Sequence, residues 1–398
     1  MEQQKIPVSI EEISPEWLTG ALTKSGVMTQ GNSVRNVDYQ IIGEGQGFVG
    51  TLARLNIEYD QQVNSLPATM IAKVPTPVKK SKMIMEAFWN YERENRIYEE
   101  ILPELPLRTP VCYFSDFDSG KGEKWMNKVY KRYGSLSQGL AGLYFVNAGL
   151  RNVGMKKRYI LLLEDLSDLE QVSHLSGCSF EEAKLVMKPL GVAHAGLWEK
   201  PELKKFWLKD HADMSNMMGF LTSRWEPIMK NTAAGKLTPK MKSVFDWINS
   251  NNRKLDKYSK SLPHTLVHTD FRLDNIFFNR KEKSVVVIDW QSPCPGFGLF
   301  DPAYFLMNNC SMPLDEGQIR ELIMVYHQGL IEGGVSNYSL EQCLSDFPVG
   351  LLLAVRYWLI IVGGIEVEND PNAVELLGVM LDRMRPMLES LDLNQLNM

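Results

Sequence analysis

HTLVHTDFRLDNIFFNRKEKSVVVIDWQ, residues 264–291, is the segment from which the architecture of this 398-residue chain is most directly predicted. One apolar run leads to His268 and Asp270, and Asn275 follows five residues after Asp270. A second apolar run, VVVI, ends at Asp289. The pattern predicts short strands that present polar side chains where they end. The alternative is an ordinary hairpin whose loop is polar.

The polar residues of this segment suit a divalent cation next to a proton acceptor. Mg²⁺ prefers oxygen ligands and keeps several waters, so the amide oxygen of Asn275 and the carboxylate of Asp289 suffice beside nucleotide phosphates. Asp270 would accept the proton of an attacking hydroxyl group or orient that group. His268 is expected to anchor the loop through hydrogen bonds.

A glycine-rich segment lies upstream, at residues 43–50, GEGQGFVG, where Gly45, Gly47 and Gly50 follow the GxGxxG spacing. That spacing alone is ambiguous, because dinucleotide-binding folds share it. Here DYQII precedes it and TLARLNIEY follows it, and both are strand-like. A loop between two strands is typical of the flap that covers ATP phosphates in kinases. The alternative is a hairpin turn rich in glycine.

Lys73 lies in the next strand-like segment, residues 69–74, where its ammonium group would lie near the α- and β-phosphates of a nucleotide. Such a lysine needs an orienting carboxylate on a neighbouring helix. Residues 82–101 repeat apolar residues at helical spacing, which predicts one helix. Glu94 lies at the edge of its apolar face and is the preferred partner, with Glu86 as the alternative.

The secondary-structure patterns divide the chain into a strand-rich front and a helix-rich rear. The boundary is expected just after LLLEDL, at residue 166, and a helix with a capping box is predicted from Ser179 and Glu182. The division favours an α+β fold with two lobes, residues 1–166 and 167–398.

Composition and charge exclude several classes of protein. The chain has 43 basic and 48 acidic side chains, a net charge of −5, which argues against a generally basic nucleic-acid binder. Five scattered cysteines and no apolar leader segment favour a cytoplasmic protein. The apolar residues 349–365 carry Arg356 and are too few to cross a bilayer, so we expect a buried helix and no transmembrane segment.

Taken in order, these elements resemble the aminoglycoside phosphotransferase and choline kinase superfamily, and within it the ecdysteroid-kinase-like branch and its bacterial relatives. The resemblance runs from the glycine loop through Lys73, Glu94, HTDFRLDN and IDWQ to GLFDPAYFL at 298–306. It implies a protein-kinase-like fold with a small β-rich lobe and a large, mostly helical lobe. It also implies an enzyme that uses ATP and Mg²⁺ to phosphorylate a small-molecule alcohol.

The resemblance implies roles for further residues. Adenine would bind to backbone groups near Glu164, Asp165 and Leu166. Arg272 falls where relatives carry a basic residue, and it would offset charge on the transferred phosphoryl group. Thr269 departs from the family, which usually has glycine there.

Two residues outside the predicted cation site are expected to be mainly structural. Asp301 precedes Pro302, as a helix N-cap residue does. His194 shares a helix face with apolar residues and is expected to be a hydrogen-bonded core histidine.

Residues 119–158 lie outside the minimal core of the superfamily. They carry nine basic side chains and one acidic side chain, which leaves the rest of the chain at −13. A solvated excursion, a lid or oligomer contact, and contact with an anionic surface all remain open.

Two other functions also remain open. One is an antibiotic phosphotransferase acting on an aminoglycoside or a macrolide, and for a cationic substrate the candidate acids are Glu366, Glu368 and Asp370. An apolar acceptor pocket would instead be lined by aromatic residues, which are more often core; the candidates are Tyr304, Phe305, Tyr357 and Trp358. The other function is that of a non-catalytic nucleotide-binding pseudokinase. The sequence names neither the acceptor nor the oligomeric state.

Overall fold

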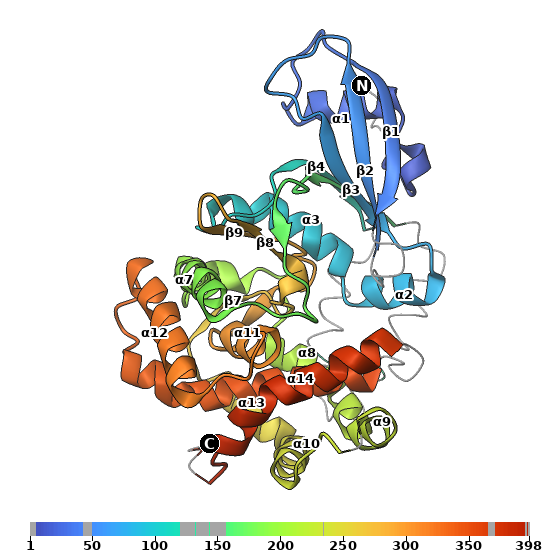
Figure 1. The fold of residues 1–398 in the computed structure, drawn as a ribbon. Coiled ribbons are helices and arrows are strands. Elements are labelled where there is room, and N and C mark those ends of the chain that lie inside the picture. The colour runs from blue at the N-terminus through green and yellow to red at the C-terminus, as the bar shows by residue number, and fades with distance from the viewer. Residues whose placement is uncertain are drawn as a thin grey trace.

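The computed structural model describes residues 5–42, 50–119, 157–233, 235–364 and 371–394, with the single residues Arg132, Leu143 and Leu396. Figure 1 shows a sheet-bearing lobe above a larger, mostly helical lobe. The predicted two-lobe α+β architecture is therefore confirmed. Several predicted features lie outside the described residues: Gly45, Gly47, most of 119–158, Glu366, Glu368 and Asp370.

The small lobe contains an antiparallel sheet in the order β1-β2-β3-β5-β4. Its strands are β1 (Val34–Ile42), β2 (Gly50–Tyr59), β3 (Thr69–Pro75), β4 (Cys112–Asp118) and β5 (Arg158–Glu164). Helix α1 (Pro15–Lys24) packs against the sheet, and its N-cap residue Ser14 accepts a hydrogen bond from the Trp17 amide. The register places Lys73 between Leu52 of β2 and Leu161 of β5, on a central strand. Arg158, counted above with the basic segment, belongs to β5.

The helix predicted over residues 82–101 is wrong as a single element, because it is two helices, α2 (Lys79–Ala87) and α3 (Asn90–Glu100). Trp89 between them has a φ of 61°, a left-handed conformation that cannot continue a right-handed helix. Tertiary contacts hold this break: the Lys209 ammonium lies 3.9 Å from the centre of the Trp89 ring, and Arg93 donates to the Phe88 carbonyl.

The large lobe consists of helices around three short strand pairings. Strands β6 (Glu170–Gln171), β8 (Ile276–Asn279) and β9 (Ser284–Val287) form one sheet, and β7 (His264–Val267) pairs with β10 (Cys294–Phe297). The helices are α7 (Phe180–Gly196), α8 (His211–Met218), α9 (Trp225–Thr232), α10 (Pro239–Ser259), α11 (Phe300–Asn309), α12 (Glu316–Glu332), α13 (Leu340–Gly364) and α14 (Pro371–Ser390). The predicted capping box of Ser179 and Glu182 begins α7.

Helix α13 contains the apolar stretch predicted as a buried helix. It is long and apolar enough to cross a membrane, but 78% of its most apolar window is buried within the protein. Arg356, at 1% exposure, pairs with Asp256 at 2.5 Å, so its charge is neutralised inside the lobe. The helix therefore packs as core.

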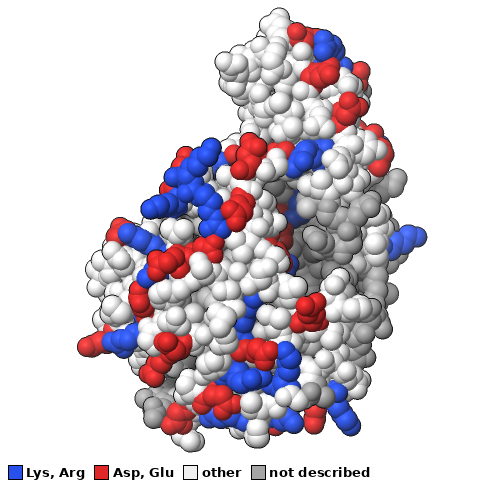
Figure 2. Space-filling model, viewed as in Figure 1, with Lys and Arg blue, Asp and Glu red and all other residues white. Residues whose placement is uncertain are grey.

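The buried apolar side chains of the described residues form two clusters. The smaller one lies between α1 and the sheet, and the larger one runs from α3 to α14. Helix α3 places Ile97 and Tyr98 in the larger cluster while its Glu94 contacts Lys73 of the sheet. It therefore links the two lobes beside the residues singled out above. Figure 2 shows acidic and basic side chains interspersed over the described surface of one face.

Candidate active site

Lys73 contacts one carboxylate in each lobe. Its Nζ lies 2.6 Å from Glu94 Oε1 and 2.7 Å from Asp289 Oδ1, a residue 216 positions further along the chain. The Lys73 side chain is 11% exposed and that of Glu94 is 3% exposed, so these two charges lie in a water-poor environment, whereas the Asp289 side chain is 23% exposed. Glu86, the alternative partner, instead interacts with Lys157 and Lys82.

Burial and charge act in opposite directions on these groups. Burial disfavours the Lys73 ammonium, but Asp289 and Glu94 outweigh it and raise the pKa of Lys73 above its ordinary value. The pKa of Glu94 lies above its ordinary value. Burial raises this pKa, the Asp289 charge adds to the rise, and the Lys73 charge opposes it. Lys73 therefore stays positively charged, and its charge favours the ionised form of the neighbouring Glu94 carboxylate.

The loop between β7 and β8 carries Asp270, Arg272 and Asn275. Arg272 Nε lies 3.1 Å from Asp270 Oδ1, and Arg272 also donates to Asp274 Oδ2 at 2.6 Å. The Asn275 amide nitrogen donates to the Asp270 backbone carbonyl at 2.9 Å and to its Oδ2 at 3.1 Å. Burial would raise the pKa of Asp270, but Arg272, His268 and Asn275 hold it below its ordinary value. The Asp270 side chain is therefore an ionised carboxylate with a fixed orientation.

Asp301 binds the backbone of this loop through its side chain. The prediction that Asp301 is an N-cap residue is wrong. The helix begins at Phe300, so Asp301 lies inside its first turn. Its two carboxylate oxygens accept from the amides of His268 at 2.7 Å and Thr269 at 3.0 Å. The buried His194, as expected for a hydrogen-bonded core histidine, contacts both Asp301 and Tyr326.

Thr269 stands where the family usually has glycine, and hydrogen bonds hold it in a backbone conformation that suits glycine. Its φ is 70°, a conformation that glycine adopts freely and that costs a β-branched residue about 1–2 kcal/mol. The Asp301 carboxylate binds its amide, and the Thr269 hydroxyl donates to the Ser292 carbonyl at 3.0 Å. These bonds hold threonine in the backbone conformation that glycine allows.

Asp289 also has left-handed backbone, with a φ of 63°. Its Oδ2 accepts from Gln291 at 3.0 Å while its Oδ1 faces Lys73. His268 anchors this segment to the loop, because its Nε2 lies 2.9 Å from the Ile288 carbonyl. Asp270 and Asp289 are thus linked through their neighbours.

The oxygen donors near Asp270 fit a hard divalent cation. The Asn275 nitrogen is used by Asp270, which leaves its amide oxygen as the donor, and Asp289 supplies a carboxylate. No group of three or more His, Cys, Asp or Glu side chains in the described part of the chain could hold a metal ion. A cation here would therefore share few protein ligands and complete its shell with substrate oxygens and water.

The expected hinge follows β5. The Glu164 carboxylate binds Arg108 and the Val111 amide, and Asp165 pairs with Arg54 at 2.8 Å. These side chains are engaged within the protein, and so are the Glu164 amide, which donates to the Val111 carbonyl, and the Leu166 carbonyl, which accepts from the Leu169 amide. Binding of adenine to backbone near residues 164–166 stays a prediction. Leu166 is buried.

Gly50 begins β2, and packing requires glycine there. A Cβ atom at this position would lie 2.9 Å from the Val74 carbonyl oxygen of the adjacent strand and 3.7 Å from the Lys73 side chain. The third glycine of the motif therefore lets β2 approach the segment that carries Lys73.

The candidate acceptor aromatics are mostly core. Tyr304, Phe305 and Trp358 are almost fully buried, and Tyr357 is half-buried. Burial raises the pKa of Tyr357, and the Asp270 charge raises it further. Tyr357 is thus the member of this group that is both partly exposed and close enough to Asp270 to sense its charge.

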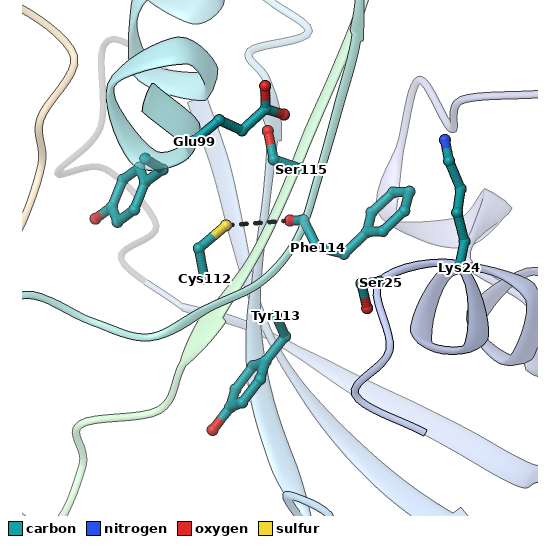
Figure 3. Close-up of a pocket in the computed structure, with 8 residues that line it drawn as sticks. Lys24, Ser25, Glu99, Cys112, Tyr113, Phe114 and Ser115 are labelled. Carbon is teal, nitrogen blue, oxygen red and sulfur yellow. Dashed lines mark hydrogen bonds between the residues drawn. The ribbon is translucent and has the colours of Figure 1, made fainter. Parts of the chain in front are cut away.

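A cavity of about 250 Å³ lies elsewhere, in the small lobe (Figure 3). It is lined by Lys24, Ser25, Tyr98, Glu99, Cys112, Tyr113, Phe114 and Ser115. None of the expected site residues lines it, and the Lys24 ammonium is engaged by Asp116 at 3.0 Å. The cavity is separate from the candidate active site.

Sequence reasoning missed several residues that orient the expected site by binding Arg272, Asp289 or the backbone of the loop. They include Asp274, Gln291 and Asn309, whose side-chain oxygen accepts from the Leu273 amide at 2.9 Å. Asp274 and Gln291 stand inside the quoted motifs, so their position was a signal. Asn309 carries no such signal.

The sequence of this chain also matches a known family. A sequence profile of the Ecdysteroid kinase-like family matches residues 44–334. A choline kinase from Cryptosporidium parvum is 10% identical with a TM-score of 0.52, covering 90% of this chain and 91% of that chain, and this likeness shows the fold. An ethanolamine kinase from Plasmodium vivax is 14% identical with a TM-score of 0.46, and the match covers 89% of this chain and 83% of that chain.

Among curated proteins, a probable acyl-CoA dehydrogenase of Arabidopsis thaliana is 34% identical over 127 residues. The match covers 30% of this chain and only 15% of that protein.

Proposed function

This chain belongs to the ecdysteroid kinase-like family, and from that premise we propose that it transfers the γ-phosphoryl group of Mg²⁺-bound ATP to a hydroxyl group of a small molecule. The contact of Lys73 with both Glu94 and Asp289 carries the proposal. A phosphate-binding lysine oriented by a helix carboxylate, next to a metal-binding aspartate, is the arrangement that phosphoryl transfer uses.

The lobes would divide the work between them. Residues 1–166 would hold the nucleotide, with Gly45, Gly47 and Gly50 over the phosphates, Lys73 on the α- and β-phosphates, and backbone near Glu164, Asp165 and Leu166 on adenine. Residues 167–398 would bind the acceptor. The five cysteines are free thiols, which suits the cytoplasmic location we propose.

Asp270 would act as the proton acceptor in the reaction. The acceptor oxygen forms a bond to the γ-phosphorus, the bond from that phosphorus to the bridging oxygen breaks, and ADP departs. Asp270 takes the hydroxyl proton, because its lowered pKa keeps it ionised. Arg272, held beside it, offsets charge on the transferred group.

Asn275 and Asp289 would hold Mg²⁺ through one amide oxygen and one carboxylate. When bound, the ion neutralises phosphate charge and orients the triphosphate. Lys73 Nζ lies 2.7 Å from Asp289 Oδ1 and would keep that carboxylate oriented toward the ion. The retained set of lysine, base and metal-binding residues favours an enzyme over a pseudokinase.

The test measures phosphorylated product by mass spectrometry after incubation with Mg²⁺, ATP and a metabolite extract. Asp270→Asn should lower product formation by roughly 10²- to 10⁴-fold, because it removes the proton acceptor. Asp246→Asn removes a charge from the exposed surface of α10 and should behave as the wild type. Equal product from the wild type and Asp270→Asn would refute the proposal.

A further inference from the structure

Helix α14 sends one arginine into the interior of the large lobe. Arg383 is 4% exposed and lies beyond residues 44–334, the part that the family profile matches. Its guanidinium donates to the carbonyls of His174 at 2.7 Å, Asn308 at 2.8 Å and Leu175 at 2.8 Å. One side chain therefore joins the segment before α7 to the end of α11.

Backbone pairing makes these two segments a single support. The Cys178 amide donates to the Asn309 carbonyl at 2.8 Å, and the Ser311 amide donates to the Cys178 carbonyl at 2.7 Å. Arg383 bonds to carbonyls on both sides of this pairing. Loss of the guanidinium would leave buried carbonyl groups without their donor.

The support grips the loop that carries Asp270 at two points. Asn309 Oδ1 accepts from the Leu273 amide at 2.9 Å, and the His174 amide donates to Asp274 Oδ1 at 3.3 Å. The other oxygen of Asp274 binds Arg272, which in turn contacts Asp270. A continuous set of contacts thus leads from Arg383 to the proton acceptor.

Gly177 leaves the space that Arg383 occupies. Its φ is 74°, and a Cβ atom there would lie 2.5 Å from Arg383 Nη2 and 2.6 Å from the Ser311 backbone. Any larger residue would displace the guanidinium or the segment it binds. The position is therefore a second, independent place to disturb the same contact.

We propose that Arg383 is a positioning residue for phosphoryl transfer, which holds the loop of residues 270–275 in its active geometry from the C-terminal helix. The inference rests on the proposed function, because it takes Asp270 as the proton acceptor. A misplacement of about 1 Å at such a group can cost roughly 100-fold in rate.

The test compares the full-length wild type with Arg383→Met by two measurements. In Mg²⁺-dependent ATP hydrolysis, with water as acceptor, kcat should fall roughly 10- to 100-fold while KM for ATP changes less than about twofold. In hydrogen exchange, the amides of residues 271–275 should exchange roughly tenfold faster, while β2 and β3 stay unchanged. Gly177→Ala should reproduce both changes, and Arg383→Lys, which keeps the charge and three donors, should restore part of them.

Arg385→Met is the matched control. Arg385 lies on the same helix, its side chain is 38% exposed, and it contacts Asp382 and the Lys236 carbonyl instead. It should leave kcat and loop exchange as in the wild type. The inference is overturned if Arg383→Met and Gly177→Ala leave loop exchange unchanged, or if Arg385→Met alters it equally. A wild type that neither hydrolyses ATP nor forms phosphorylated product from the metabolite extract would defeat the proposed function, and the exchange measurement would still decide the role of Arg383.

Discussion

The Lys73 cluster and the Asp270 loop lie on the two sides of one candidate site, yet they are held by different forces. Lys73 is held by ion pairs to Glu94 and Asp289, which come from separate parts of the chain. The loop is held chiefly by backbone amides that donate to Asp301 and Asn309. Removal of one charge should therefore disturb the first region, whereas the second should respond to changes in its buried supports.

The difference follows from what each region would do. Lys73 faces a polyanion, so its partners must leave its positive charge in place while they orient it. The Asp270 carboxylate must stay ionised and keep its orientation. The backbone amides of His268 and Thr269 fix the chain next to it by donating to Asp301, so they do not occupy the Asp270 oxygens.

The largest effect is expected from Lys73→Met, which leaves Glu94 and Asp289 beside one another without their cation. Removal of one partner of a buried ion pair costs about 3–5 kcal/mol, and binding of Mg²⁺-ATP should weaken as well. Chemical denaturation measures the first quantity. Lys73→Met combined with Glu94→Gln should recover part of the loss, because it removes one of the unpaired carboxylates. A loss below about 1 kcal/mol would show that the ion pairs do not hold this region.

A smaller effect is expected from pH on the support of the loop, through His174. Burial lowers the pKa of this imidazole to about 4, with Arg272 and Arg383 acting the same way and Asp274 and Asp270 opposing them. The folded protein thus holds His174 neutral, whereas the unfolded chain titrates near 6.5. Its contribution to stability is complete above pH 6.5 and is lost as the pH falls toward 4.

From pH 7 to pH 5 this loss should amount to about 2 kcal/mol of unfolding free energy. His174→Asn should show a shallower decline over the same range than the wild type, measured by denaturation at each pH. Parallel declines in the two proteins would mean that His174 is not held neutral.

The sequence predicted the parts of the fold and site that depend on regular spacing. The strand-like segment that contains Lys73 and the capping box at Ser179 predicted elements that the structure contains. The order of charged residues singled out Lys73, Glu94 and Asp289, which the structure brings into contact. Local patterns were sufficient there because each residue type carries its own chemistry.

The parts that escaped prediction depend on tertiary contacts. The break at Trp89 is stabilised by Lys209, more than a hundred positions away, and no local pattern shows it. Arg383 donates to backbone carbonyls, which every residue type has, so the sequence gives no sign of which residues it binds. Asp301 resembled an N-cap residue because an aspartate before proline commonly is one.

Calorimetric titration with Mg²⁺ and a non-hydrolysable ATP analogue would show whether Asp289 binds the metal ion that accompanies the nucleotide. We expect the wild type and Asp270→Asn to bind the analogue with similar affinity, and Asp289→Asn to bind it at least about tenfold more weakly because it loses a metal-binding carboxylate. No heat with the wild type, or equal affinity for all three proteins, would contradict this expectation.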